Sequence, residues 1–369
     1  MIFSRFDDVK IAAIAASVPA KVMDIANRLN DPNEDPKFIK SFMKNTGIRM
    51  RRKSGYEQTA SDFSFTAAKQ ILDSGYYKPE EIGVLINLTQ TPDYRTPSTA
   101  LVLQKRLGLS KNCIAFDINL GCSGFVYGVA LAASILKTST ASKGLVTVGD
   151  TLARGRKHIK LKRSSNTGLL FGDASAAILV EKNAERGFCA ALMSDGTGHK
   201  ALSIPYNAWK HPVGPESIPG DDIAVFNFTI SEVPALLKEY MSVTGTNVED
   251  YDALILHQAN MMILKNVAKR VGFSMDKVPV SLDRFGNTSG CSVPLTIVDK
   301  YGASEEDKVV NLLTSSFGVG LSWGVVGFQI NVKDVLPLTE GTDTYDDGYS
   351  DDVELDKVDD GFIDDNKEK

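Results

Sequence analysis

A strand that runs into a tight turn and then into a helix is the most constraining feature of this sequence. The apolar run from Cys113 to Ile118 leads into Gly121-Cys-Ser-Gly124, and residues 125–136 then show a helical pattern. The two glycines permit a sharply turned, exposed backbone around Cys122. A thiol at the start of a helix lies near the positive end of the helix dipole, which favours the nucleophilic thiolate. Cys122 is therefore a candidate nucleophile, although unpaired cysteines are also among the most commonly buried residues.

Apolar runs of strand length recur along the chain, and helical patterns separate them. Strands are expected over 11–20, 82–88, 113–118, 144–149, 253–256, 308–314 and 321–332, and a glycine turn with a further strand within 168–180. Helices are expected over 61–74, 98–107 (capped by Ser98), 125–136, 230–243, 262–271 and before 301. These strands are apolar enough to be covered on both faces, which predicts a layered α/β architecture. The chain has 369 residues, which is more than a single hydrophobic core usually supports, so two sub-domains are expected. The run 11–20 resembles the apolar part of a signal peptide, but its shortness and flanking charges favour a buried strand.

The charge is divided unevenly along the chain. Residues 339–369 hold 13 Asp or Glu and three Lys, a net charge of −10, so the rest of the chain carries +5. The segment Asp346–Asp352 recurs with small changes as Asp359–Asp365. A segment of this composition buries too little apolar surface to offset its ordering entropy, so residues 337–369 are expected to form a disordered, acidic tail. Such a tail could solubilise the protein or compete with anionic ligands within the same molecule. The aspartates lack the spacing of an EF-hand, so calcium binding is not expected.

A basic stretch follows the strand at 144–149. Residues 151–166 carry six Lys or Arg, which could form a solvated loop or a docking surface for a phosphate-bearing substrate or an acidic carrier. No window has the roughly 18 apolar residues of a membrane span, so membrane insertion is not expected. The four cysteines and four histidines show no metal-ligand spacing. We therefore expect no metal, no nucleic-acid partner and a reducing compartment, the cytoplasm.

Two further residues stand at the ends of predicted elements. His257 follows the buried strand 253–256, and Asn287 lies in Gly286-Asn-Thr-Ser289 before a helix. Ligands of open α/β sheets bind at the carboxyl ends of strands, where Cys122 and His257 are both expected. Taken singly, His257 could be a buried structural histidine and Asn287 a helix cap. Together with Cys122 they suggest a nucleophile served by two hydrogen-bonding groups.

Several short motifs, in this order along the chain, resemble those of β-ketoacyl-ACP synthase III. They are Thr46-Gly-Ile-Arg49, Gly121-Cys-Ser-Gly124, Phe171-Gly-Asp173, His257-Gln-Ala-Asn260, Gly286-Asn-Thr-Ser289, Ser292-Val-Pro294 and Phe317-Gly-Val-Gly-Leu-Ser-Trp-Gly324. The resemblance extends from about residue 10 to residue 332. It implies the thiolase fold, in which two βαβαβαββ halves form five αβαβα layers, and it implies a homodimer. The halves are expected at 1–185, carrying the cysteine, and 186–336, carrying the histidine and asparagine, with the tail at 337–369.

The resemblance also implies a mechanism that needs no cofactor. Cys122 would accept an acyl group from an acyl-CoA or acyl-carrier donor, and the main-chain N–H groups of Cys122 and Val319 would hold the oxyanion. His257 and Asn287 would then stabilise the enolate formed when malonyl-acyl carrier protein loses CO2. The product would be a β-ketoacyl thioester. The family usually has Gly where Val319 stands, but only a main-chain donor is required there.

Substrate and carrier contacts are implied in the same way. The matching positions are Arg49, Asn260, Lys269, Arg270 and Thr96, while Phe171–Asp173 would be structural support. The second Arg that flanks the CoA adenine in the family falls near Ser165, and Arg163, two residues away, is the candidate for its role. Thr96 stands where the family has a Phe that the dimer partner inserts at the acyl pocket. Ser41 replaces the aromatic residue that stacks on the CoA adenine, and Met262 replaces an Arg that contacts the carrier. These departures indicate a divergent member with a roomier acyl pocket, serving specialised lipid, polyketide or surface-glycan biosynthesis.

Related families share some of these residues. Thiolase is disfavoured because no cysteine follows Cys291, and hydroxymethylglutaryl-CoA synthase is disfavoured because it needs a catalytic Glu upstream of the cysteine, whereas Glu80 and Glu81 lie in a polar turn. Type III polyketide synthase shares the three residue types but matches the short motifs less well. A non-condensing acyltransferase acting on an alcohol or amine, and an inactive acyl-binding partner subunit, remain the alternatives.

Overall fold

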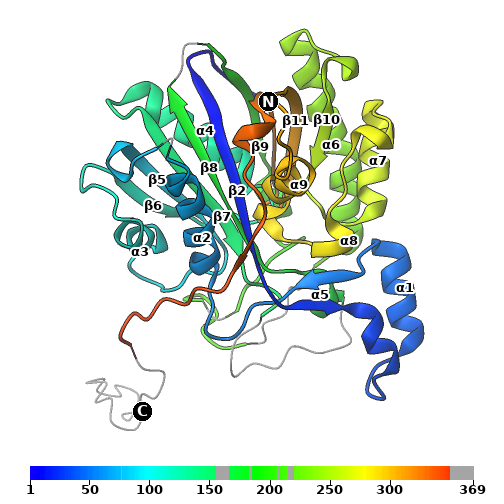
Figure 1. Cartoon of the computed structure of the whole chain (residues 1–369). Coiled ribbons are helices and arrows are strands. Elements are labelled where there is room, and N and C mark those ends of the chain that lie inside the picture. Colours follow the sequence, from blue (N-terminus) through cyan, green and yellow to red (C-terminus); the bar gives the residue numbers. More distant parts are fainter. Residues whose placement is uncertain (76, 155–165, 183–184, 207, 215–219, 350–369) are drawn as a thin grey trace, which may run out of the picture.

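Two β-sheets are stacked with helices between them and on both outer faces (Figure 1). The computed structural model describes residues 1–369 with the exception of 76, 155–165, 183–184, 207, 215–219 and 350–369. One sheet has the strand order β13-β2-β8-β7-β5-β6, and the other has the order β1-β9-β12-β11-β10. A short ribbon pairs β3 (Val22–Asp24) with β4 (Met50–Arg52), next to α1 (Pro36–Thr46).

The first half of the chain builds most of the six-stranded sheet. Its strands are β2 (Val9–Pro19), β5 (Ile82–Leu88), β6 (Ile114–Ile118), β7 (Lys143–Asp150) and β8 (Ala174–Lys182). Its main helices are α2 (Ala60–Asp73), α3 (Thr99–Arg106) and α4 (Gly124–Thr138), and the short α5 (Asn166–Leu170) precedes β8. The order β2-α2-β5-α3-β6-α4-β7-β8 is the expected βαβαβαββ. The apolar run near the N-terminus is the buried strand β2, as expected.

The second half builds the five-stranded sheet with a small departure. Its strands are β9 (Phe188–Ser194), β10 (Ala253–Leu256), β11 (Val309–Gly318) and β12 (Ser322–Asn331), and its helices are α6 (Asp222–Thr244), α7 (Met261–Val271), α8 (Leu282–Phe285) and α9 (Ser292–Tyr301). The βαβαβαββ pattern calls for a third strand between α7 and α9, but residues 278–281, which lie there, form no strand. The strand expected at 308–314 continues to Gly318, because β12 pairs with it along its full length.

Three apolar cores hold the layers together. The central core joins both sheets to α4 and α9, the second packs α6 and α7 on the five-stranded sheet, and the third packs α2 and α3 on the six-stranded sheet. The helix α4 is buried around most of its circumference because it lies between two sheets, as its apolar sequence requires. The molecule is therefore a five-layered αβαβα structure, the thiolase fold.

Both ends of the chain cross to the opposite sheet. The N-terminal strand β1 (Ile2–Phe6) pairs with β9 in the second sheet, and β13 (Thr339–Gly341) pairs in parallel with Ser17–Pro19 of β2 in the first. The expected division of the chain at residues 185 and 186 therefore does not separate the two sheets completely. The first half lends β1 to the second sheet, and the segment after residue 336 adds β13 to the first. The expectation of a disordered tail from residue 337 is wrong for its first part, since residues 337–349 have a described position. Composition alone could not show that the edge of β2 was open to this segment.

Some helix boundaries follow local sequence signals, and the start of α3 does not. Asp35 caps α1 by accepting a hydrogen bond from the Lys37 N–H (2.9 Å), and Gly272, at φ 99°, closes α7 as expected. Ser98 does not cap α3 with its side chain. The carboxylate of Asp117, at the end of β6, accepts hydrogen bonds from the N–H groups of Thr99 (2.6 Å) and Ala100 (2.8 Å) instead. No helix in the described part of the chain is long and apolar enough to span a bilayer.

Candidate active site

Cys122 lies in the turn between β6 and α4, where close packing fixes its backbone. The Gly124 N–H donates to the Gly121 carbonyl (2.7 Å) and closes the turn. A Cβ at Gly318, at the end of β11, would come within 2.5 Å of the Cys122 Cβ, and a Cβ at Gly290 within 2.6 Å of the Gly121 oxygen. Glycine is therefore required at positions 318 and 290, which pack against the turn. Cys122 itself is almost fully buried.

The charge state of Cys122 differs from the expectation. Burial, and to a smaller extent the charge of Asp150, raise the pKa of the Cys122 thiol to about 11, while contacts with Ser289 and the main-chain N–H groups of Cys122 and Val319 lower it. The favourable effect of the helix N-terminus is thus outweighed by loss of hydration, and the resting group is a thiol. The pairing of the Cys122 and Val319 N–H groups as an oxyanion-binding site stays a prediction.

His257 follows β10 and is buried in a neutral state. Its Nδ1 lies 2.6 Å from the Ser292 Oγ at the start of α9, and its ring packs edge-on against Phe317 (5.4 Å between centroids). Burial lowers the pKa of His257 to about 4, and a hydrogen bond with the Ser289 main chain offsets part of this shift. With Nδ1 bound to Ser292, Nε2 is the nitrogen that can face a ligand.

Asn287 is held by main-chain pairing with residues before β8. Its N–H donates to the Leu170 carbonyl (2.9 Å), and its carbonyl accepts from the Gly172 N–H (3.0 Å). Its Oδ1 accepts from the Ser289 N–H (2.9 Å), so the NH2 group is the end of the amide that remains to donate to a ligand. The predicted catalytic asparagine is therefore fixed on both its backbone and its side chain.

The motif Phe171–Asp173 acts as the expected support. A Cβ at Gly172 would meet the Phe285 oxygen at 1.9 Å, so only glycine allows the approach to Asn287. The buried carboxylate of Asp173 accepts from the Ser54 N–H (2.9 Å) and hydroxyl (2.8 Å) and from the Ala153 N–H (2.7 Å). These bonds tie the motif to segments on either side of it.

Ser289 connects the three predicted catalytic residues. Its Oγ lies 4.0 Å from the Cys122 Sγ, its N–H binds Asn287, and its main chain hydrogen-bonds to His257. It adopts φ 52°, a left-handed conformation that is uncommon for residues other than glycine. The sequence motif contained Ser289 and Ser292, but residue type alone gave no sign that both organise the site.

Asp150 is a second residue that the sequence did not single out. It ends β7, and its buried Oδ1 accepts from the Gln90 N–H (2.7 Å) and from the hydroxyls of Thr89 (3.0 Å) and Thr91 (3.3 Å). Burial raises the pKa of Asp150 to about 6, while hydrogen bonds, first that of Ser289, lower it. A lone acid after an apolar strand was the only available signal. Among the described residues, no three His, Cys, Asp or Glu side chains gather as metal ligands.

The residues predicted to contact substrate or carrier lie on the surface or at helix ends. Arg49 is exposed and pairs with Asp24 (3.3 Å), and Thr96 is exposed in the loop before α3. Lys269 and Arg270 are exposed in the last turn of α7. Asn260 caps the same helix, its Oδ1 accepting from the Ile263 N–H (2.9 Å), so it has a structural contact that was not expected.

The basic stretch is described only at its start. Arg154 donates to the Gln58 carbonyl (2.7 Å). The other five basic residues, Arg163 among them, lie outside the described residues.

Comparison with known proteins agrees with this geometry. The family described as 3-oxoacyl-[acyl-carrier-protein (ACP)] synthase III matches residues 116–196, and its C-terminal part matches residues 241–330. The first range contains Cys122, and the second contains His257 and Asn287. The chain is similar to β-ketoacyl-[acyl-carrier-protein] synthase III of Clostridium acetobutylicum, with 32% identity over 325 residues, 86% of this chain and 97% of that protein. The enzyme of the same name from Caldanaerobacter subterraneus is 36% identical over 75% of this chain and 85% of its own.

Solved structures show the same relationship. The crystal structure of 3-oxoacyl-(acyl-carrier protein) synthase from Burkholderia xenovorans matches with a TM-score of 0.85 and 31% identity, over 92% of this chain and 99% of that one. The synthase III structure from Thermus thermophilus matches with a TM-score of 0.76 and 30% identity, over 86% and 98%. With its thiolase fold and this extent of similarity, the chain belongs to the β-ketoacyl-acyl carrier protein synthase III family of condensing acyltransferases.

Proposed function

We propose that this protein condenses an acyl thioester with a malonyl thioester on acyl carrier protein, through an acyl group on Cys122. The observation that carries the proposal is the contact of Ser289 with Cys122, His257 and Asn287. A nucleophile next to two neutral hydrogen-bond donors suits a reaction in which an enolate must form beside a bound acyl group.

In the first half-reaction Cys122 exchanges its proton for the acyl group. The thiol sulfur attacks the thioester carbonyl, and the N–H groups of Cys122 and Val319 stabilise the oxygen of the tetrahedral intermediate. The bond to the donor sulfur then breaks, and the thiol proton ends on the departing thiol. Because the pKa of Cys122 is raised to about 11, proton loss must accompany the attack instead of preceding it.

In the second half-reaction His257 and Asn287 act on the malonyl thioester. Nε2 of His257 and the NH2 group of Asn287 donate to the thioester oxygen, so that the electron pair left by departing CO2 is held as an enolate. The enolate carbon attacks the acyl carbonyl, and the Cys122 sulfur leaves. The His257 pKa of about 4 means that neither donor carries a charge at neutral pH.

The donor and carrier contacts belong to the proposal. We assign Arg49, Arg163, Asn260, Lys269 and Arg270 to contacts with the donor or the carrier. The exposed Lys269 and Arg270 lie side by side in the last turn of α7, where they suit an acidic carrier protein. The donor is an acyl-CoA or an acyl-carrier thioester.

A homodimer is proposed from the open edge of the six-stranded sheet. The strand β6 lies at the edge of this sheet. Its first residue, Ile114, is 53% exposed, and Leu101 on the neighbouring α3 is 44% exposed. An unpaired edge strand with exposed apolar side chains is a site for pairing with a second copy. Thr96, in the loop before α3, would then border the acyl pocket of the partner.

The test of the proposal is acylation measured by intact mass. Incubation with a panel of acyl-CoA and acyl-carrier donors should add one acyl group to the native protein and to Cys113→Ala, which removes another buried cysteine. The Cys122→Ala variant should gain none. Acylation of Cys122→Ala at the native rate would contradict the assignment of the nucleophile.

Transfer to an alcohol or amine without condensation, or an inactive partner subunit, is not favoured. The relatives named above are synthases, and the Oδ1 of Asn287 is held by the Ser289 N–H, which leaves the NH2 group as a donor. Plain acyl transfer would need no enolate stabilisation.

A further inference from the structure

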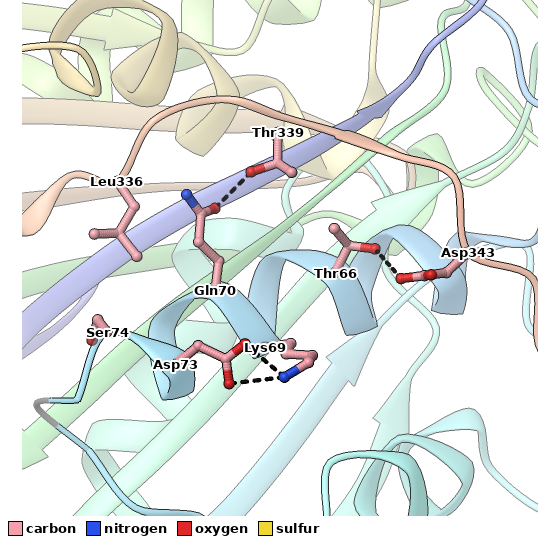
Figure 2. A pocket seen from close by; sticks show the side chains of 8 residues that line it. All are labelled: Thr66, Lys69, Gln70, Asp73, Ser74, Leu336, Thr339 and Asp343. Atoms are coloured by element: carbon pink, nitrogen blue, oxygen red, sulfur yellow. Dashed lines mark hydrogen bonds and ion pairs between the residues drawn. The ribbon is translucent and has the colours of Figure 1, made fainter.

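The C-terminal segment continues beyond the part of the chain that the family shares and lies across the first half. The match to the family ends at residue 330. The segment 339–349, here called the strap, begins with β13 on the edge of β2 and runs over α2 (Figure 2). The Thr339 hydroxyl donates to the Gln70 Oε1 (2.9 Å), and Arg52 forms an ion pair with Glu340 (2.6 Å). The strap is therefore attached at its start by main-chain and side-chain bonds.

The middle of the strap is anchored by an aromatic contact. The guanidinium of Arg106, on α3, lies 4.8 Å from the ring centroid of Tyr345 and 4.5 Å from that of Phe65. Arg106 is itself fixed by a buried ion pair with Asp62 on α2 (3.0 Å). The Tyr345 hydroxyl accepts a hydrogen bond from the Lys105 Nζ (3.3 Å). A cation held between two aromatic faces gives this anchor a defined position.

The end of the strap contacts the loop 89–97, which connects β5 to α3. The Tyr94 hydroxyl of this loop donates to the Asp347 carboxylate, and the Tyr349 ring meets the Tyr94 ring edge-on (6.3 Å). Tyr94 is only partly buried. The outer end of the loop is thus bonded to the strap.

The inner end of the same loop enters the candidate active site. Thr89, Gln90 and Thr91 bind Asp150, and the Gln90 Oε1 lies 3.5 Å from the Oγ of Ser289. The loop 89–97 therefore spans the distance between the residues around Cys122 and the strap. A displacement of the outer end of this loop should shift its inner end, because only a few residues separate the two ends.

We propose that the strap is a positioning and specificity element, which holds the loop 89–97 in place and so shapes the acyl-binding side of the active site. The effect on the acyl pocket rests on the proposed function, whereas the ordering of the loop does not. The strap acts through Tyr345 and Asp347, and its β13 portion serves as the attachment. Donors of different acyl length would therefore be accepted differently with and without the strap.

Two truncations of the full chain separate the strap from the acidic residues that follow it. Removal of 350–369 keeps every contact named above, and removal of 342–369 keeps β13 but deletes Tyr345 and Asp347. Hydrogen exchange of amides in 89–97 should be about tenfold faster in the 342–369 deletion and unchanged in the 350–369 deletion. Equal exchange in the 342–369 deletion and the full chain would overturn the proposal.

Single substitutions test the anchors in a full-length chain. Tyr345→Ala should speed exchange in 89–97 as the long deletion does, and Tyr94→Phe should do so more weakly because it removes only the hydroxyl that binds Asp347. The matched control is Asp346→Asn, since the Asp346 carboxylate accepts from the Gly348 N–H (2.9 Å) within the strap itself. Exchange in 89–97 that responds to Asp346→Asn but not to Tyr345→Ala would contradict the assignment of the anchors.

The preference for short or long acyl donors distinguishes a positioning role of the strap from a purely stabilising one. The ratio of kcat/KM for short and long acyl donors should change at least about threefold in the 342–369 deletion and in Tyr345→Ala. A lower thermal midpoint with unchanged exchange in 89–97 and an unchanged donor ratio would show that the strap only stabilises the fold, which overturns the proposal. If the full chain transferred no acyl group, the proposed function would fail, and the exchange experiments would still decide whether the strap orders the loop.

Discussion

Burial sets the charge state of each titratable residue around Cys122. It raises the pKa of Asp150 to about 6 and that of Cys122 to about 11, and it lowers that of His257 to about 4. The sequence could not predict these values, because it placed the thiol at a helix N-terminus but did not show how little water reaches it. Cys122 and His257 are therefore neutral at pH 7, while Asp150 is charged and opposes ionisation of the thiol.

Removal of the Asp150 charge should make Cys122 more reactive. In Asp150→Asn the second cause of the raised thiol pKa disappears, so the thiolate fraction at pH 8 increases. We expect alkylation of Cys122 by iodoacetamide, followed by mass spectrometry, to be several-fold faster. The control is Asp173→Asn, a second buried acid whose bonds go to Ser54 and Ala153. Slower alkylation in Asp150→Asn of a folded protein would show that the carboxylate does not act through its charge.

His257 should make stability depend on pH below neutrality. Its pKa is about 4 in the folded state and about 6.5 in an unfolded chain, so the unfolded state binds more protons as the pH falls from 6.5 to 4. The free energy of unfolding should decrease in this window, by up to about 3 kcal/mol from this residue. Urea unfolding of His257→Gln between pH 4 and 7 should show a shallower decrease than the native protein. Parallel curves for the two proteins would contradict the buried, neutral state of His257.

Individual elements were largely predictable, and their ends were less so. The strand-turn-helix around Cys122, the buried strand before His257 and the glycine that closes α7 follow from local patterns. The cap of α3 does not, because the capping carboxylate is that of Asp117 on the following strand β6, 18 residues from Thr99. The extension of β11 likewise depends on its pairing with β12. Local sequence determines an element, whereas its boundary depends on the neighbours it meets.

The helix α4 should not tolerate a larger residue at Gly128. A Cβ there would lie 2.6 Å from a methyl group of Leu88 and 2.8 Å from one of Val146, both on the six-stranded sheet. Although alanine is the better helix former, we expect Gly128→Ala to lower the free energy of unfolding by about 1–3 kcal/mol, measured in urea. Gly55→Ala, where no atom of the residues that the structure describes lies within 4 Å of the added Cβ, should be close to neutral. A Gly128→Ala protein as stable as Gly55→Ala would mean that α4 packs less closely on the sheet.

For the molecule as a whole, the sequence predicted the layers and suggested three catalytic residues, but it did not show how these residues are connected. Cys122, His257 and Asn287 could be singled out because each stands at the end of an element within a recognisable motif. Ser289 and Asp150 could not, because a serine inside a motif and a lone acid after a strand are common, and their links to the site form only in the folded molecule. The crossing of β1 and β13 to the opposite sheets also depends on open edges that exist only in the folded molecule.

The open edge at β6 should control the oligomeric state. We expect the native protein to sediment as a dimer of 40.0 kDa chains and Ile114→Lys to shift it toward monomer, because a charge would be buried between the two edges. The control is Ile2→Lys, at a position that is 74% exposed on the edge strand β1 of the other sheet. A native monomer, or a dimer broken by Ile2→Lys and not by Ile114→Lys, would refute the proposed interface.

Condensation itself is tested most directly by following CO2 release from the acyl-enzyme. The acyl-enzyme is first formed and verified by intact mass, and malonyl-acyl carrier protein with a labelled free carboxyl group is then added. The native protein and Asn266→Ala, which alters a half-buried amide on α7 that donates to the Met262 carbonyl, should release labelled CO2 and form a β-ketoacyl thioester. Asn287→Ala should be acylated normally but release CO2 at least about a hundredfold more slowly. Undiminished CO2 release by Asn287→Ala, or a native acyl-enzyme that forms no β-ketoacyl product, would contradict the account.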